Sequence, residues 1–117
     1  MISALLFDFG QTLVDSSEGF RTAEKEAEQA VFHFLNGVSW DAFLESYRRL
    51  RRELHGQSNF SRQDLFRGVC RSAGREPETE RLVQWENRYW DRVRAATRLF
   101  PETVEVLTRL RSSYRLG

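Results

Sequence analysis

The sequence predicts the beginning of an α/β protein that is mostly helical: one strand, a series of amphipathic helices, and a return toward a second strand. Residues 2–7 form a nearly continuous apolar run that Asp8 and Gly10 end, which is typical of a strand buried on both faces of a parallel sheet. Apolar positions then recur at helical spacing through most of the chain. Residues 114–117 predict the start of another strand.

The composition predicts a single hydrophobic core, since 40% of the 117 residues are hydrophobic and 13% are aromatic. The 18 basic and 17 acidic side chains give a formal net charge of +1. This balance excludes a strong electrostatic attraction of the whole molecule to nucleic acid or to anionic membranes. No apolar run approaches the roughly 20 residues that cross a bilayer, and the N-terminus lacks the basic segment of a signal peptide. A single cysteine, Cys70, excludes an internal disulfide, so we expect a cytoplasmic protein.

Five helices are predicted from apolar periodicity and from residues that cap helices. The first four are expected after Ser16 and Ser17, after Ser39, after Ser61 and over residues 78–95, with ends near Gly37, Gly56, Gly74 and Ala95. Ser61 and Asp64 have the spacing of a capping box. The apolar line of the fourth helix comprises Leu82, Trp85, Tyr89 and Val93. The fifth helix is expected to begin at Pro101 and to carry Val104, Leu107 and Leu110 on its apolar side.

Residues 7–16, FDFGQTLVDS, resemble the first motif of the haloacid dehalogenase (HAD) superfamily. That motif is an apolar strand followed by Asp, any residue, Asp, Gly, Thr and Leu. The resemblance implies a HAD-like parent fold with a Rossmann-like parallel α/β sheet. It also implies a division into the first core strand and nucleophile loop (1–16), an α-helical cap (17–97), and the start of the return to an incomplete core (98–117).

The resemblance also implies the roles of three residues. Asp8 matches the family's nucleophile, which forms a covalent aspartyl intermediate with the substrate. Its other carboxylate oxygen and the backbone carbonyl of Gly10 match the atoms that hold Mg²⁺ in the phosphatase members. Thr12 matches a residue that supports the phosphate or the turn. The expected activity is therefore Mg²⁺-dependent hydrolysis of a small phosphorylated metabolite.

Two departures from the family pattern affect this interpretation. Gly10 and Gln11 stand where the pattern has its second Asp and its Gly, so the carboxylate that would protonate the leaving group is absent. The later family motifs, a Ser or Thr after the second strand, a Lys or Arg and an acidic pair, have no match, because the only lysine is Lys25 in the first predicted helix. We expect the chain to end before those motifs and to be inactive alone.

Two other functions remain open. Gly10 favours a 2-haloacid dehalogenase-like hydrolase, because a departing halide needs no proton, and that reaction needs no Mg²⁺. The missing motifs favour a non-enzymatic helical module that binds a partner. The oligomeric state stays open, although a strand at residues 2–8 without neighbours in its own chain could pair or swap between chains.

The remaining polar and aromatic residues are assigned structural roles. Asp15 is expected to cap the first helix rather than to steer substrate. Four arginines, Arg48, Arg49, Arg51 and Arg52, wrap around one helix and predict a solvated surface rather than a phosphate-facing patch. The tryptophans Trp40, Trp85 and Trp90 predict core positions rather than a substrate pocket. Cys70 is expected to be a buried apolar residue, and His33 and His55 receive no metal-binding role.

Overall fold

The computed structural model describes residues 1–57 and 60–117 and divides the chain into two compact units. Unit 1 combines the two ends of the chain, Met1–Thr22 and Arg92–Gly117. Unit 2 is the helical segment Ala23–Asp91. In the described part of the chain, no helix is both long enough and apolar enough to cross a membrane.

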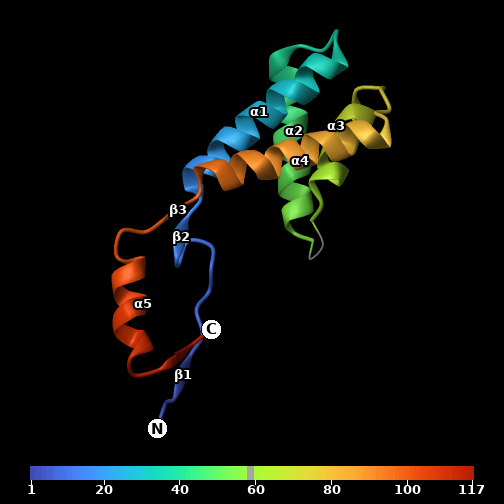
Figure 1. The fold of residues 1–117 in the computed structure, drawn as a ribbon. Helices are drawn as coiled ribbons and strands as arrows, with labels where there is room; N and C mark the ends of the chain where they lie inside the picture. Colours follow the sequence, from blue (N-terminus) through green and yellow to red (C-terminus); the bar gives the residue numbers. More distant parts are fainter. Residues whose placement is uncertain (58–59) are drawn as a thin grey trace. The chain divides into compact units, whose positions relative to one another are not determined.

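Helices dominate the chain, and the strands are short (Figure 1). The order is β1 (Ala4–Leu5), β2 (Val14–Asp15), α1 (Ser17–Leu35), α2 (Trp40–His55), α3 (Arg62–Ser72), α4 (Thr79–Ala96), β3 (Arg98–Leu99), α5 (Thr103–Arg111) and β4 (Arg115–Leu116). β1 pairs with β4 in parallel, and β2 pairs with β3 in antiparallel orientation. The sequence predicts neither β2 nor β3, because a two-residue strand is too short to show a period.

The parallel pair of unit 1 extends beyond the two residues of each strand. The Arg115 N–H donates to the Ser3 carbonyl at 3.0 Å, and the Phe7 N–H donates to the Gly117 carbonyl at 2.8 Å. Helix α5 leads from β3 to β4 and packs against β4 (Figure 1). The predicted strand near the C-terminus is thus confirmed. The predicted lack of an in-chain neighbour for the first strand is wrong, because β4 pairs with β1.

The prediction that residues 2–7 are buried on both faces is also wrong. Ile2 and Leu6 are 69% and 88% exposed, whereas Leu5 and Phe7 are half-buried. Successive side chains of a strand point to opposite faces, so this alternation shows that only one face of β1 is covered. Among the described residues, β4 is the only strand that pairs with β1, so this sheet is too small to enclose it.

Unit 2 forms a helical core to which α1, α2, α3 and α4 each contribute one apolar face. The buried side chains are Ala23, Ala27, Val31 and Leu35 of α1, Phe43 and Tyr47 of α2, Leu65, Phe66, Val69 and Cys70 of α3, and Leu82, Trp85 and Tyr89 of α4. The predicted apolar line of α4 is confirmed, since Val93, which belongs to unit 1, is buried as well. Burial raises the pKa of the Cys70 thiol to about 11, as expected of a cysteine in the core.

The predicted helix boundaries agree with the structure where a capping side chain or a residue with positive φ marks the end of the helix. Ser39 Oγ accepts the Ala42 N–H at 3.3 Å at the start of α2. Ser61 Oγ accepts the Gln63 N–H at 3.2 Å, so the cap of α3 differs from the predicted capping box. Gly74 has a φ of +79° just after α3, in the left-handed region that glycine adopts without steric cost.

The predicted start of the fifth helix and the predicted burial of several apolar residues are wrong. Helix α5 begins at Thr103 rather than at Pro101, because the Thr103 N–H donates to the Phe100 carbonyl in a turn that precedes the helix. Val104, predicted on the apolar side of this helix, is 60% exposed. Trp85 is buried as predicted, whereas Trp40 and Trp90 are 38% and 40% exposed. Periodicity alone places such residues on a face of a helix, but their burial depends on what packs against that face.

Candidate active site at the end of the first strand

Asp8 lies in unit 1, on the loop that joins β1 to β2. The preceding residue, Phe7, makes the last hydrogen bond of the parallel ladder, so the carboxylate follows the carboxyl end of β1. Ligands of parallel α/β sheets bind at this end of the strands. Asp8 is exposed, and it forms no ion pair with another described residue. The carboxylate is therefore accessible to a substrate.

A tight turn follows Asp8 and is organised around one carbonyl group. The Phe9 carbonyl accepts the N–H groups of Thr12, Leu13 and Val14 at 3.4, 3.0 and 3.3 Å. No described N–H group donates to the neighbouring Gly10 carbonyl. The Phe9 carbonyl oxygen is thus occupied by N–H groups of the turn, whereas the Gly10 carbonyl oxygen is available to a ligand.

The same turn brings Thr12 close to Asp8. The Thr12 hydroxyl donates to Asp8 Oδ2 at 3.5 Å, which is the outer limit of a hydrogen bond. Both side chains are exposed, so a bound substrate would compete with this weak contact. The structure therefore places the predicted nucleophile beside the predicted supporting residue, whereas the chemical role of each stays a prediction.

Gln11 holds the turn in a conformation that non-glycine residues rarely adopt. Its φ is +61°, in the left-handed region, at the position where the HAD motif has glycine. Its side-chain Oε1 accepts the N–H of Ser16 at 3.1 Å, and Ser16 is buried. In the sequence, Gln11 is recognisable only as a departure from the motif. The glycine of the motif is the signal that this position requires positive φ.

Two substitutions at Gln11 separate its strain from its hydrogen bond. Gln11→Ala keeps the positive φ and removes the acceptor of the Ser16 N–H, so we expect it to lower the free energy of unfolding by about 1 kcal/mol. Gln11→Gly removes the same acceptor but relieves a left-handed strain of about 1–2 kcal/mol, so we expect little net change. Urea titrations followed by NMR signals of unit 1 measure both. Equal destabilisation by Ala and Gly would show that the backbone of Gln11 is not strained.

Asp15 caps helix α1, as predicted. Its Oδ1 accepts the Ser17 backbone N–H at 3.1 Å and the Ser17 hydroxyl at 2.6 Å. Ser17 is the first residue of α1, so Asp15 satisfies an N–H group that has no partner within the helix. These hydrogen bonds from Ser17 lower the pKa of the Asp15 carboxyl. Asp15 thus serves the helix start rather than the reacting centre.

Thr103 holds the far end of the loop that carries Asp8, and no motif in the sequence indicates this role. Its buried hydroxyl donates to the Leu13 carbonyl at 2.8 Å. The Phe100 N–H donates to the same carbonyl at 3.3 Å. These contacts join residues about 90 positions apart in the sequence, so no local pattern could reveal them. They attach the loop that carries Asp8 to the start of α5.

The loop after β1 carries oxygen atoms of the kind that bind hard metal ions, without a full set of side-chain ligands among the described residues. None of them form a group of three or more His, Cys, Asp or Glu side chains that could hold a metal. The exposed Asp8 carboxylate and the available Gly10 carbonyl are oxygen atoms, the ligand type that Mg²⁺ prefers. Mg²⁺ usually keeps several waters and also binds substrate phosphates. These two oxygens are therefore suitable ligands for Mg²⁺, and they would supply only part of its coordination shell.

The four arginines of α2 belong to unit 2 and differ in their surroundings. Arg48, Arg49 and Arg52 are exposed, as predicted for a solvated surface. Arg51 is half-buried, and its Nη1 lies 3.6 Å from Glu24 Oε1, so the prediction is wrong for this residue. Arg51 lies one turn after the buried Tyr47 on α2, and the Glu24 carboxylate compensates its charge.

The two histidines make local contacts. The Nδ1 of His33 lies 2.7 Å from the Gln29 carbonyl one turn earlier on α1. The ring of His55 stacks on Phe60 with 4.8 Å between the ring centroids. Both contacts are those of ordinary surface residues at the ends of helices.

No protein-family model matches the chain, and no curated protein matches it. Among solved structures, it is similar to a haloacid dehalogenase-like family hydrolase from Streptococcus pneumoniae, with 27% sequence identity and a TM-score of 0.46. The match covers 98% of this chain and 47% of that protein. The chain therefore spans about half the length of the hydrolase to which it is similar.

Proposed function

We propose that the chain carries the nucleophile loop of a HAD-like phosphatase that acts on a small phosphorylated metabolite, with Asp8 as the nucleophile. The observation that supports this proposal most is the placement of Asp8. Its accessible carboxylate follows the last hydrogen bond of a parallel strand pair, and the Thr12 hydroxyl lies 3.5 Å away. The similarity of residues 7–16 to the HAD motif supports the same assignment.

The proposed reaction has two steps at Asp8. One carboxylate oxygen attacks the phosphorus, the bond from phosphorus to the leaving oxygen breaks, and the electron pair stays on the leaving oxygen. Water then attacks the resulting aspartyl phosphate, which releases inorganic phosphate and restores the carboxylate. The second Asp8 oxygen and the Gly10 carbonyl would hold Mg²⁺, which supplies neutralisation of the phosphate charge. Thr12 would support the phosphate or the turn, and its hydroxyl lies 3.5 Å from Asp8 Oδ2.

The 117-residue chain by itself is expected to show no measurable Mg²⁺-dependent hydrolysis of an aryl phosphate. Positioning and charge neutralisation by several groups carry most of phosphoryl-transfer catalysis, and Asp8 with one carbonyl supplies few of them. A spectrophotometric assay of the purified chain, with and without Mg²⁺, tests this. Turnover that disappears in Asp8→Asn would show that the chain holds a more complete site than we infer.

The nucleophile is tested in the product of the complete reading frame. Asp8→Asn is expected to lower kcat by about 10⁴-fold or more, because loss of a nucleophile removes the covalent route. Asp15→Asn is the matched control, since Asp15 is a nearby carboxylate in β2 that accepts two hydrogen bonds from Ser17 at the start of α1. Asp15→Asn should keep kcat within a few-fold. Similar rates for Asp8→Asn and Asp15→Asn would refute the assignment of Asp8.

Gly10 favours a second candidate, a hydrolase of 2-haloacids. Gly10 offers no acid to the leaving group, and a halide leaves without a proton. In that reaction an Asp8 oxygen attacks the carbon that bears the halogen, halide departs with the bonding electrons, and water hydrolyses the ester. Release of halide in the presence of a metal chelator, lost in Asp8→Asn, would favour this candidate over the phosphatase.

A further inference from the structure

Unit 2 contains a cleft that none of the proposed active-site residues line. It has a volume of about 290 Å³ and lies between the end of α1, one side of α2 and the second half of α3. Its lining includes Leu35, Phe43 and Val69 on the floor and Ser46, Arg49 and Ser72 among its polar residues. The volume lies near the lower limit of about 300 Å³ for small-molecule sites.

The floor of the cleft is apolar and well packed. Leu35, Phe43 and Val69 are 6%, 1% and 1% exposed, so they belong to the core of unit 2. Phe43 also contacts the rings of Trp40 and Tyr47, with centroid distances of 5.5 and 5.7 Å. A floor made from core side chains is held in place before any ligand binds, which lowers the entropic cost of binding.

The two serines of the cleft already use their hydroxyl protons within the protein. Ser72 Oγ donates to the Val69 carbonyl at 2.8 Å. Ser46 Oγ and Ser72 Oγ lie 3.1 Å apart, so Ser46 is the donor in this pair. The Ala42 N–H, which also lies at the cleft, is capped by Ser39 Oγ at 3.3 Å. These groups therefore offer no free donor to a ligand.

Arg49 supplies a donor and a positive charge. It is exposed, and it forms no ion pair with any residue in the described ranges. Glu45 and Glu53 lie four positions before and after it on α2, at the spacing where helical ion pairs form, yet neither is paired with it. The guanidinium at the cleft is thus available to an anion.

We propose that this cleft binds a medium-chain aliphatic carboxylate, with the hydrocarbon chain on the apolar floor and the carboxylate on Arg49. A single guanidinium binds a carboxylate through two parallel hydrogen bonds and matches its single charge. A phosphate dianion needs more donors, and the serines and the Ala42 N–H provide none. The negative carboxylate complements the positive charge of Arg49. The hydrocarbon chain of the ligand complements the apolar side chains of Leu35, Phe43 and Val69.

The proposal is tested by ¹H–¹⁵N NMR titration of the 117-residue chain with octanoate. Saturable shifts are expected at the amides of Val38, Ala42 and Ala73, which line the cleft. Arg49→Gln should weaken octanoate binding about three- to tenfold, as expected for an exposed charge-assisted contact. Arg48→Gln is the matched control, because Arg48 is exposed on the same helix and does not line this cleft.

Two further ligands and one further variant distinguish the proposal from weaker alternatives. Octanol, which lacks the charge, should bind more weakly than octanoate and should not respond to Arg49→Gln. Inorganic phosphate should not saturate the same signals. Ala42→Leu, which places a larger side chain at the exposed edge of the cleft, should lower the affinity without unfolding α2. Equal losses in Arg48→Gln and Arg49→Gln, tighter binding of phosphate, or shifts confined to other surfaces would each overturn the proposal.

Discussion

Replacing Gly10 by Asp is expected to raise kcat/KM for alkyl phosphates by about 10²- to 10⁴-fold in the product of the complete reading frame. A carboxylic acid two residues after the nucleophile, as in the HAD motif, would protonate the leaving oxygen. Aryl and acyl phosphates should gain little, because their leaving groups depart without a proton. The effect is thus expected to grow with the pKa of the leaving group.

The backbone at Gly10 accepts this substitution. Gly10 does not have the positive φ that would strain an aspartate, and a Cβ built on it meets no other heavy atom within 4 Å beyond its chain neighbours. The adjacent Gln11 carries the positive φ of this turn instead. A failure of Gly10→Asp to change the rates would therefore concern the chemistry rather than the local geometry.

The measurement is a plot of log kcat/KM against leaving-group pKa for Gly10, Gly10→Asp and Gly10→Asn. The asparagine variant has nearly the same size as aspartate but no acidic proton, so its slope should equal that of the natural chain. The slope should become shallower only in Gly10→Asp. Equal slopes in all three proteins would mean that a water or another residue already protonates the leaving group.

Removing the guanidinium of Arg62 is expected to destabilise unit 2 by about 3 kcal/mol. Arg62 Nη1 donates to both carboxylate oxygens of Glu24 at 3.0 and 2.9 Å, and the Tyr47 hydroxyl donates to Glu24 Oε1 at 2.6 Å. The side chains of Arg62 and Glu24 are 8% and 15% exposed. Burial and the Glu24 carboxylate raise the pKa of Tyr47 well above its usual range, so its hydroxyl stays a donor.

Arg62→Met leaves the Glu24 carboxylate partly buried, with Arg51 at 3.6 Å as the nearest remaining guanidinium. Arg62 also covers the Tyr89 ring, with 4.3 Å from its guanidinium carbon to the ring centroid, and methionine retains only part of that packing. The double variant Glu24→Leu with Arg62→Met removes both charges and should be less destabilised than Arg62→Met alone. That difference would measure the cost of the unpaired carboxylate.

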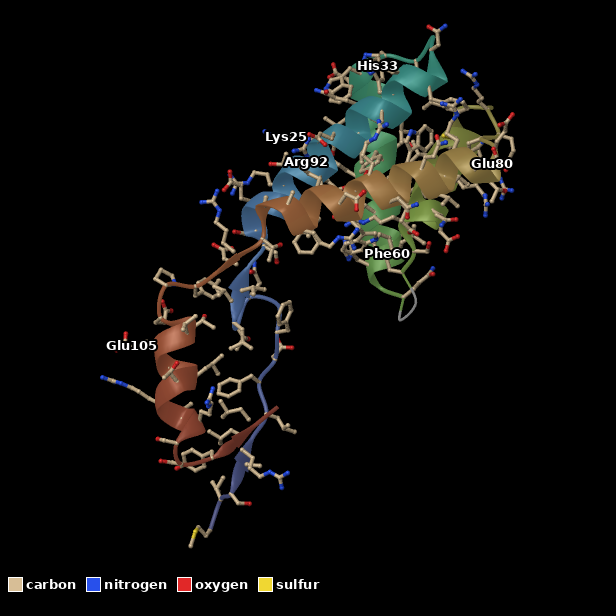
Figure 2. The ribbon with its side chains drawn as sticks, in the orientation of Figure 1. Lys25, His33, Phe60, Glu80, Arg92 and Glu105 are labelled. Carbon is tan, nitrogen blue, oxygen red and sulfur yellow. The ribbon has the colours of Figure 1, made fainter. Side chains whose placement is uncertain are left out.

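Urea unfolding followed by tryptophan fluorescence reports on unit 2, because Trp40, Trp85 and Trp90 all lie within it. Glu80→Gln is the control within the same unit, because Glu80 is an exposed carboxylate in the first turn of α4 (Figure 2). Its removal should cost less than about 0.5 kcal/mol. An Arg62→Met protein as stable as Glu80→Gln would show that the buried pair contributes no more than an exposed charge.

The sequence by itself determined the helices and the position of the candidate nucleophile. The apolar spacing and caps predict α1 to α4 nearly to the residue, because these signals act within one or two turns of the chain. The apolar run before Asp8 and the turn after it likewise place this carboxylate at the end of a strand. All of these inferences depend on residues within a few positions of one another.

Only the tertiary structure decided which distant residues meet and which apolar residues stay exposed. β1 pairs with β4 across more than 100 residues, Thr103 holds the Leu13 carbonyl, and Arg62 binds Glu24 from another helix. No periodic pattern encodes such contacts, because each depends on how whole elements pack. The exposure of Leu6 has the same origin. An apolar run indicates which residues can be buried, but the elements that pack against the strand determine which of them are buried.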